Sequence, residues 1–148
     1  MLAACIGAAF VAGAIGSAVT FENVRTWYPA LAKPSWNPPN WIFGPVWTTL
    51  YVLMGTAAWR VWRTGFTARP LVMGYFVHLL PNALWSILFF GFKQPAWALT
   101  EILMLWVLLV WLLVGFWRAD RLAGLLWLPY VLWVTFATAL NSAIVWLN

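Results

Sequence analysis

Three polar and aromatic side chains recur at helical spacing within an apolar stretch near the middle of the chain. His78, Asn82 and Trp85 are spaced i, i+4 and i+7, so on a helix they project from one face. Imidazole, amide and indole groups inside a membrane need hydrogen-bond partners, which a ligand or a neighbouring helix supplies. The spacing therefore predicts either a ligand-binding face or a set of interhelical hydrogen bonds. For His78, axial ligation of a haem iron is a further alternative.

Two other apolar stretches carry faces of the same kind. Trp47 and Tyr51 lie one helical turn apart in an earlier stretch. In the last stretch, the shared face consists of Tyr130, Trp133, Ala137 and Asn141. Aromatic rings that each carry one N–H or O–H group suit a flat, apolar ligand, so the three faces together predict one pocket. For Asn82 and Asn141, hydrogen bonding between helices is the alternative role.

The sequence lacks the residue patterns of soluble enzymes. It contains no Gly-rich phosphate loop, Ser/His/acid set, paired carboxylates or Cys/His cluster, so we expect no metal site and no required cofactor. One acidic residue, Glu101, lies inside an apolar stretch. Such a carboxylate is typical of proton relays and cation-coupled transporters, but no intramembrane lysine or arginine accompanies it here. We interpret Glu101 as a structural carboxyl bonded to a neighbouring helix.

The composition is that of a membrane protein. Hydrophobic residues make up 65% of the 148 residues and charged residues only 7%, whereas a soluble domain has about 25% charged residues. A net charge of +5, spread over so few side chains, does not predict a nucleic-acid partner. The basic residues are better explained as anchors at the surface of a lipid bilayer.

The elements that must position these faces are five apolar runs, each close to the ~20 residues needed to cross a bilayer. We expect helices at residues 2–20, 42–62, 70–91, 95–117 and 122–147. The first run has no basic residue before Arg25, so we interpret it as a retained helix rather than a secretory signal. Short connections between the later runs make sequential helices antiparallel neighbours. The fold class expected is an all-α integral membrane protein with a single domain over residues 1–148.

A Trp- and Pro-rich connection is expected at residues 23–41. Pro29, Pro34 and the Pro38-Pro39 pair oppose a regular helix and stiffen the backbone. Trp36 and Trp41 on such a rigid loop suit a lid over a hydrophobic ligand. The alternative is an interfacial loop whose tryptophans lie at the level of the lipid headgroups.

Charges in the connections predict the orientation. The side that holds the N-terminus carries five arginines: Arg60, Arg63, Arg69, Arg118 and Arg121. The opposite side carries Arg25, Lys33 and Lys93. The positive-inside tendency therefore places the N-terminus in the cytoplasm, and we expect a bacterial inner-membrane protein.

The pattern W-Y-x-x-L-x-K-P-x-W-x-P-P-x-W-x-x-x-P-V-W-x-x-L-Y, from Trp27 to Tyr51, resembles the translocator protein family, also called tryptophan-rich sensory proteins. The resemblance continues through Asn82-x-x-Trp85 and Pro129-Tyr130-x-x-Trp133 and covers nearly the whole chain. It departs from the family at His78, where glutamine is frequent. It departs again after Asn141, where the Tyr and Lys/Arg of a proposed sterol motif are missing.

The resemblance implies a five-helix membrane protein that forms homodimers and binds porphyrins, sterols and isoquinoline or benzodiazepine drugs. It implies that Trp36 and Trp41 shape a lid and that six residues line a pocket: Trp47, Tyr51, Asn82, Trp85, Trp133 and Ala137. Trp47 and Trp133 match tryptophans implicated in light-dependent porphyrin breakdown. We therefore expect a receptor or sensor with a tetrapyrrole ligand, protoporphyrin IX or haem. A light- and oxygen-dependent porphyrin-degrading enzyme and a transporter of tetrapyrroles or sterols are the alternatives.

Overall fold

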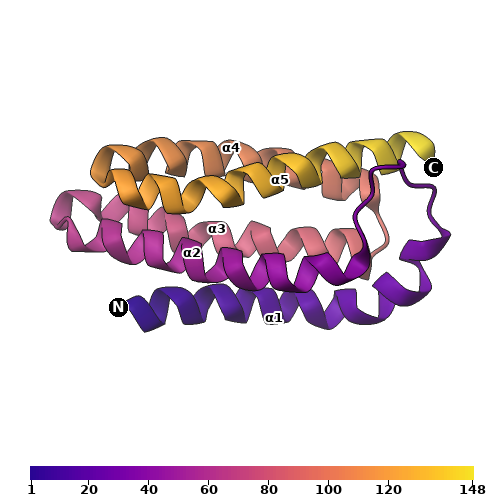
Figure 1. Ribbon diagram of the computed structural model, residues 1–148, viewed down its shortest axis with the longest axis horizontal. Helices are drawn as coiled ribbons and strands as arrows, with labels where there is room; N and C mark the ends of the chain where they lie inside the picture. The colour runs from indigo at the N-terminus through magenta and orange to yellow at the C-terminus, as the bar shows by residue number, and fades with distance from the viewer.

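Five long helices form the molecule. The computed structural model describes the backbone of residues 1–148 and all side chains except that of Phe66. The long helices are α1 (Leu2–Thr26), α2 (Phe43–Arg63), α3 (Arg69–Ser86), α4 (Pro95–Ala119) and α5 (Arg121–Leu147). They lie side by side in one elongated bundle (Figure 1). No strand occurs in the described backbone, so the prediction of an all-α fold is confirmed.

Four helical segments are long and apolar enough to cross a membrane. They are α1, α4, α5, and α3 together with the turn that continues it to Gly91. Helix α2 has 21 residues, but its Trp, Tyr and Thr side chains and its glycines dilute the apolar ones, and it falls below the required hydropathy. The prediction of membrane-spanning helices is thus supported for four of the five expected spans.

Helix α1 is longer than the sequence indicated. It continues to Thr26 instead of ending at residue 20, because the first proline that opposes helix is Pro29. The Arg25 guanidinium lies 4.4 Å from the centre of the Phe21 ring one turn earlier, which supports this last part of the helix. The connection expected over residues 23–41 therefore begins at Trp27. It contains two short 3₁₀ helices, Tyr28–Ala30 and Asn40–Ile42.

The C-terminal end of α3 widens into a π-helical turn, Ile87–Gly91. Such a turn holds one residue more than an α-helical turn and rotates the side chains that follow. The adjacent residues Phe89 and Phe90 of this turn are both buried, with 2% and 8% of their surface exposed. The sequence predicted a helix over residues 70–91, with an interruption only at Pro81, and gave no sign of this turn.

The end of the bundle near Met1 is tightly packed. A methyl group built on Gly55 would lie 2.8 Å from the backbone nitrogen and Cα of Ile6, so α1 and α2 are in close contact there. The Tyr75 hydroxyl donates a hydrogen bond of 2.6 Å to the Cys5 carbonyl. Trp127 is fully buried, and its indole nitrogen donates to the Leu109 carbonyl at 3.1 Å. The Tyr75 and Trp127 rings contact each other at 6.1 Å between centroids, so the five helices share one core.

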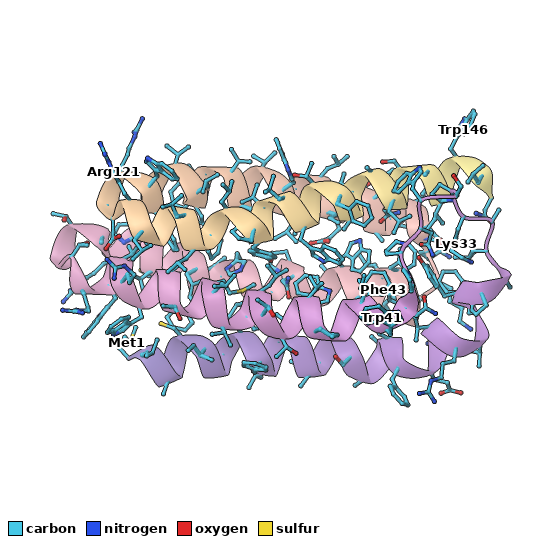
Figure 2. All side chains as sticks on the ribbon, viewed as in Figure 1. Met1, Lys33, Trp41, Phe43, Arg121 and Trp146 are labelled. Carbon is cyan, nitrogen blue, oxygen red and sulfur yellow. The ribbon has the colours of Figure 1, made fainter. Side chains whose placement is uncertain are left out.

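The connection between α4 and α5 is fixed by Asp120. Its carboxylate accepts a hydrogen bond from the Ala123 backbone at 3.0 Å, which caps α5. It also pairs with the Arg60 guanidinium at 2.8 Å. Partial burial opposes ionisation, but the Arg60 hydrogen bond and charge and the backbone donors outweigh it and lower the pKa of Asp120. Figure 2 shows Met1 and Arg121 at this end of the molecule and Lys33 and Trp146 at the other.

Candidate functional site

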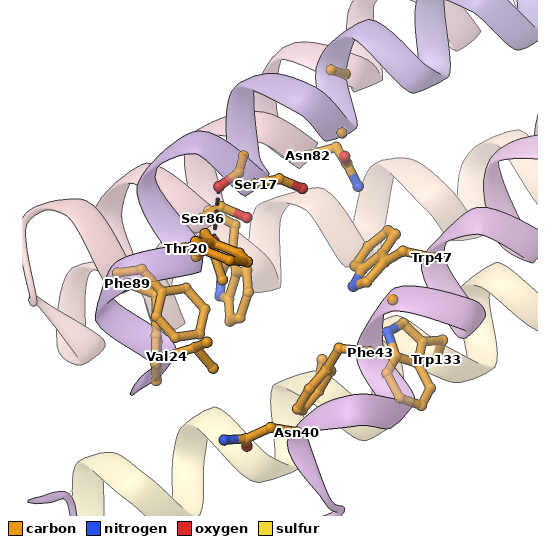
Figure 3. Close-up of a pocket in the computed structure, with 18 of the residues that line it drawn as sticks. Ser17, Thr20, Val24, Asn40, Phe43, Trp47, Asn82, Ser86, Phe89 and Trp133 are labelled. Atoms are coloured by element: carbon orange, nitrogen blue, oxygen red, sulfur yellow. Dashed lines mark hydrogen bonds between the residues drawn. The ribbon is translucent and has the colours of Figure 1, made fainter. Parts of the chain in front are cut away.

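A cavity of about 450 Å³ occupies the half of the bundle below the connection between α1 and α2. Its walls come from α1, α2, α3 with its π-helical turn, and α5, and Figure 3 shows how the side chains surround it. The lining includes exposed side chains of α1 and α2, among them Phe10, Phe21 and Thr48, so the cavity reaches the outer surface of the bundle at these two helices. An opening between two helices faces the hydrocarbon of a bilayer rather than water.

One wall of the cavity is aromatic. The Phe43 and Trp133 rings lie edge to face with centroids 6.0 Å apart, and Trp47 lies 5.5 Å from Tyr51. Phe43, Trp47 and Tyr51 come from one face of α2, and Trp133 from α5, so the wall depends on the packing of these two helices. Trp47 and Trp133 lie on the same side of the cavity (Figure 3). Together these rings provide a large apolar surface for a ligand.

The π-helical turn completes a second aromatic group at the closed end. Trp85 and Phe89 are stacked with centroids 5.1 Å apart and ring planes 24° from parallel. Phe90 lies 4.8 Å from Phe89 and 5.7 Å from Tyr28, which belongs to the connection. Phe89 and Phe90 both belong to this turn and both line the cavity. The connection is thus packed directly against the cavity wall.

The opposite wall is polar but carries no charge. Asn82 and Ser86 lie one turn apart on α3 and face Ser17 and Thr20 of α1 (Figure 3). Thr20 donates to the Gly16 carbonyl of its own helix at 2.8 Å. Ser17 and Ser86 have no hydrogen-bond partner among the described residues. Two hydroxyl groups are therefore available to a ligand.

The two predicted asparagines also connect helices. The Asn82 amide nitrogen donates to the Tyr130 hydroxyl at 2.8 Å, which joins α3 to α5. Asn141 accepts a hydrogen bond from the Trp85 indole at 3.1 Å and donates to the Pro95 carbonyl at 2.9 Å. The two roles that the sequence left open, pocket wall and interhelical contact, therefore coexist in both residues.

The connection between α1 and α2 is held by its own polar groups. The Tyr28 hydroxyl donates to Asn37 at 2.7 Å, and burial raises the pKa of Tyr28 to about 12, so this donor keeps its proton at neutral pH. The Lys33 ammonium donates to the carbonyls of Tyr28 and Leu31 at 2.7 and 2.8 Å. Asn148 forms two hydrogen bonds with the backbone of Ala32, at 3.0 and 2.9 Å. This last pair fastens the connection to the end of α5.

The structure brings most of the predicted site residues to the cavity. Seven of them line it: Trp47, Tyr51, Asn82, Trp85, Trp133, Ala137 and Asn141. Trp36 packs against Phe136, with ring centroids 5.7 Å apart, and does not itself reach the lining. Trp41 is 71% exposed and points away from the bundle.

Neither His78 of α3 nor Glu101 of α4 belongs to the cavity lining. His78 is fully buried between the rings of Tyr75, Trp127 and Tyr130, and its Nδ1 donates to the Tyr75 carbonyl. His78 and the three rings around it lie outside the cavity lining, so a haem in the cavity would not be ligated by this residue. Glu101 is also buried, and its carboxyl oxygens have no partner in the described part of the chain. The bond to a neighbouring helix that the sequence led us to expect is not formed.

Several lining residues were not predicted. The most important are Ser17, Thr20, Phe43, Ser86, Phe89 and Phe136. Ser86 falls one turn after Asn82, so the spacing that selected Asn82 also applies to it. Ser17 and Thr20 are three residues apart on α1, and the residues around them in the sequence are mostly small or apolar, so they did not stand out as a polar face. Only the packing of α1 on α3, where Ser86 lies close to Gly16, makes their position evident.

A bundle of long apolar helices around an internal aromatic cavity defines a helical membrane protein. The chain belongs to the TspO/MBR family, whose sequence model matches residues 5–147. The tryptophan-rich protein TspO of Archaeoglobus fulgidus is 43% identical over 148 residues, which cover 99% of this chain and 96% of that protein. The tryptophan-rich protein TspO of Chlorobaculum tepidum is 41% identical, with 99% and 95% covered. The human translocator protein is 37% identical over 134 residues, with 88% and 79% covered. The protein is therefore an integral membrane protein, and the resemblance found from its motifs is confirmed.

Proposed function

We propose that the protein is a membrane receptor or sensor that binds a tetrapyrrole, such as protoporphyrin IX or haem, in the cavity of the bundle. The observation that carries this proposal is the aromatic wall, in which Phe43, Trp47 and Trp133 from two helices face one open space. A cavity of about 450 Å³ lies within the size range of small-molecule pockets. The names of the relatives, sensory protein and translocator protein, are consistent with a ligand-binding role. Sterols and isoquinoline or benzodiazepine drugs have the same flat, apolar chemistry.

We further propose that the connection of residues 27–42 is the lid of this cavity. Tyr28 lines the cavity and contacts Phe90, and Trp36 packs on Phe136, which also lines it. Trp41, exposed at the same end, provides an anchor at the membrane surface. Movement of the lid would separate Tyr28 from Phe90 and open this end of the cavity.

The topology we propose has five membrane crossings, with α2 as the fifth, in a bacterial inner membrane with a cytoplasmic N-terminus. Helix α2 lies among the four apolar helices and matches them in direction and length (Figure 1). Cysteine labelling in intact cells tests the orientation, in a chain with Cys5 replaced by serine. A cysteine at Asn40 should react with an impermeant reagent, and a cysteine at Thr67 should not. Reversed labelling would contradict the orientation.

We also propose a homodimer in the membrane. The outer surfaces of α3 and α4 carry large exposed apolar side chains, among them Met73, Leu80, Met104 and Trp111. Such surfaces contact either lipid or a second copy of the chain. Single cysteines placed along α3 and α4 should crosslink to a covalent dimer in native membranes. The positions that crosslink should recur with the period of a helix. Crosslinks without periodicity, or none, would contradict the dimer.

Porphyrin affinity of a double variant tests the proposed function. In Trp47→Phe/Trp133→Phe, loss of aromatic contact should cost about 1 kcal/mol for each ring pair, or roughly fivefold in affinity for each. The matched control is Trp97→Phe/Trp146→Phe, which changes two exposed tryptophans outside the cavity lining and should bind as the wild type does. Protoporphyrin binding is followed by ligand absorbance, because fourteen tryptophans make protein fluorescence ambiguous. Unchanged affinity in the first variant would place the ligand elsewhere.

Light-dependent porphyrin degradation is the second candidate function. It is favoured by one observation, that two oxidisable indoles, Trp47 and Trp133, both line the cavity. Illumination of the protoporphyrin complex in the presence of oxygen distinguishes the candidates. A defined product at many turnovers, lost in the double variant under saturating ligand, would establish an enzyme. Slow bleaching that consumes the protein's own tryptophans would support a receptor.

A further inference from the structure

The end of the bundle near Met1, opposite the connection between α1 and α2, carries an excess of positive charge. Five arginines lie there at the ends of four helices: Arg60 and Arg63 of α2, Arg69 of α3, Arg118 of α4 and Arg121 of α5. Of the three acidic residues of the chain, all of which the structure describes, only Asp120 lies at this end, and it pairs with Arg60 at 2.8 Å. Arginines therefore outnumber acidic residues by four at this end of the molecule.

The helix dipole explains some of these arginines but not all. Three of them lie in the last turns of α2 and α4, where the partial negative charge of a helix C-terminus stabilises a cation. Arg69 and Arg121 are instead the first residues of α3 and α5, where the partial charge of the helix is positive. Asp120 compensates for Arg121, because its carboxylate caps the same helix. The first turn of α3 has no acidic residue and no side-chain cap, so the dipole and Arg69 both favour an anion there.

A cleft of about 210 Å³ lies beside Arg69, between the end of α2 and the start of α3. Its described lining consists of Trp62, Gly65, Arg69 and Val72. Trp62 is 47% exposed and Val72 is buried, so the cleft combines an accessible indole and an apolar floor with one guanidinium group. Gly65 adopts a φ of +112°, and a methyl group built on it would have no neighbour within 4 Å, so the cleft is open at this residue. Such a cleft suits an anionic group that is attached to an apolar chain.

Tryptophans place this end of the bundle at the interface between bilayer and water. The dipeptide Trp-Arg occurs at the end of α2, as Trp62-Arg63, and at the end of α4, as Trp117-Arg118. Both tryptophans are partly exposed. Indoles are enriched at the level of lipid headgroups, and guanidinium groups bind phosphate through paired N–H donors. A soluble anion would use the guanidinium alone, whereas a phospholipid would also contact Trp62 and Val72.

We propose that this cleft binds one acidic phospholipid, with its phosphate at Arg69 and its glycerol and first acyl carbons against Trp62 and Val72. Arg63 adds to the attraction at the same level, and its guanidinium lies 5.1 Å from the centre of the Trp59 ring. A zwitterionic headgroup would bring a further cation to a surface that already has an excess of arginine, so an acidic headgroup is preferred. The cleft lies at the end of the bundle opposite the lid of the tetrapyrrole cavity (Figure 2), so this lipid site goes beyond the proposed function.

Competition between two lipids tests the headgroup. The purified full chain in detergent is mixed with equal amounts of phosphatidylglycerol and phosphatidylcholine that carry the same acyl chains, and native mass spectrometry counts the lipids that stay bound. We expect one phosphatidylglycerol to be retained about fivefold in preference to phosphatidylcholine, the contribution of one basic residue near an anionic lipid. Equal retention of the two lipids would overturn the proposal. Glycerol 3-phosphate in excess should not displace the lipid, and displacement would assign the cleft to a soluble phosphate instead.

A matched pair of arginine variants locates the site. Arg69→Gln should abolish the preference for phosphatidylglycerol, whereas Arg121→Gln should retain it, although it removes the same charge from the first residue of another helix at the same end. Equal loss in both variants would show a diffuse attraction to the whole surface and would overturn the site.

A third variant tests the apolar part of the cleft and does not depend on the charge of Arg69. Trp62→Ala should weaken retention of both lipids to the same extent, because it removes apolar contact and leaves the charge in place. Thermal unfolding of the three variants without added lipid shows whether each is folded. Unchanged retention of both lipids in a folded Trp62→Ala variant would place the lipid outside the cleft.

Discussion

The two halves of the bundle are built from the same helices but differ in how closely those helices approach. In the half near Met1, Gly55 brings α2 against the Ile6 backbone, and no space is left between the helices. In the half near the connection, Gly44 of the same helix has no neighbour within 4 Å of an added methyl group. Small residues of α2 allow close approach in the packed half, whereas the same helix in the hollow half carries aromatic rings that line a space without filling it. Large side chains can therefore create a cavity when they contact each other along its walls.

The largest expected effect is the loss of stability from a substitution in the packed half. In Gly55→Ala, the added methyl group would lie 2.8 Å from the Ile6 backbone, which cannot move aside as a flexible side chain would. We expect a loss of about 3 kcal/mol in the free energy of unfolding, at the upper end of overpacking effects. Thermal unfolding in detergent measures it. Gly44→Ala is the matched control and should unfold as the wild type does, so equal destabilisation of the two variants would contradict the contrast.

A pair of tryptophan variants separates packing from binding. Trp127 is fully buried and donates to Leu109, so Trp127→Phe should lower stability by about 2 kcal/mol and leave porphyrin affinity unchanged. Trp133→Phe should do the reverse, with stability nearly unchanged and affinity reduced about fivefold. Thermal unfolding and ligand titration on both variants give the four values. A similar loss of stability in both would show that the aromatic wall is part of the core.

The Asp120–Arg60 pair should contribute about 1 kcal/mol at the packed end, because both side chains are partly exposed. The pKa of Asp120 is lowered in the folded state, so its contribution is complete above the ordinary carboxyl pKa of about 4 and is lost as the pH falls through the lowered value. Asp120→Asn should remove this pH dependence. Unfolding temperatures measured from pH 7 down to pH 3 check it, and an unchanged profile in the variant would assign the acid sensitivity to another group.

The smallest expected effect on stability comes from removing the hydrogen bonds that hold the connection to Asn148 in the hollow half. Asn148→Ala removes two hydrogen bonds to the Ala32 backbone at an exposed site, so we expect less than about 1 kcal/mol in global stability. Amide hydrogen exchange around Ala32 should nevertheless increase, because the connection opens locally. Asn23→Ala, which removes only a bond to Val19 within α1, is the control. Equal exchange at Ala32 in both variants would show that Asn148 does not hold the lid.

The membrane class and much of the cavity lining could be predicted from local features of the sequence. Low charge and five long apolar runs predicted the membrane class, because a bilayer requires continuous apolar helices with their backbone bonds satisfied internally. Helical spacing placed Asn82 and Trp85 on one face and Trp133 and Ala137 on another, and all four line the cavity. Spacing of this kind is fixed by the geometry of a single helix, so no knowledge of its neighbours was needed.

Other features depended on how the helices pack. His78 shares the spacing of Asn82, yet the rings of Tyr75, Trp127 and Tyr130 enclose it away from the cavity. Ser17 was no candidate for the site from the sequence, and only the close approach of Gly16 and Ser86 placed it in the wall between α1 and α3. The rotation of a helix about its axis, and the π-helical turn that buries both Phe89 and Phe90, result from contacts between residues far apart in the chain. The sequence by itself determined which residues share a helix face, and the tertiary structure alone decided which faces meet around an empty space.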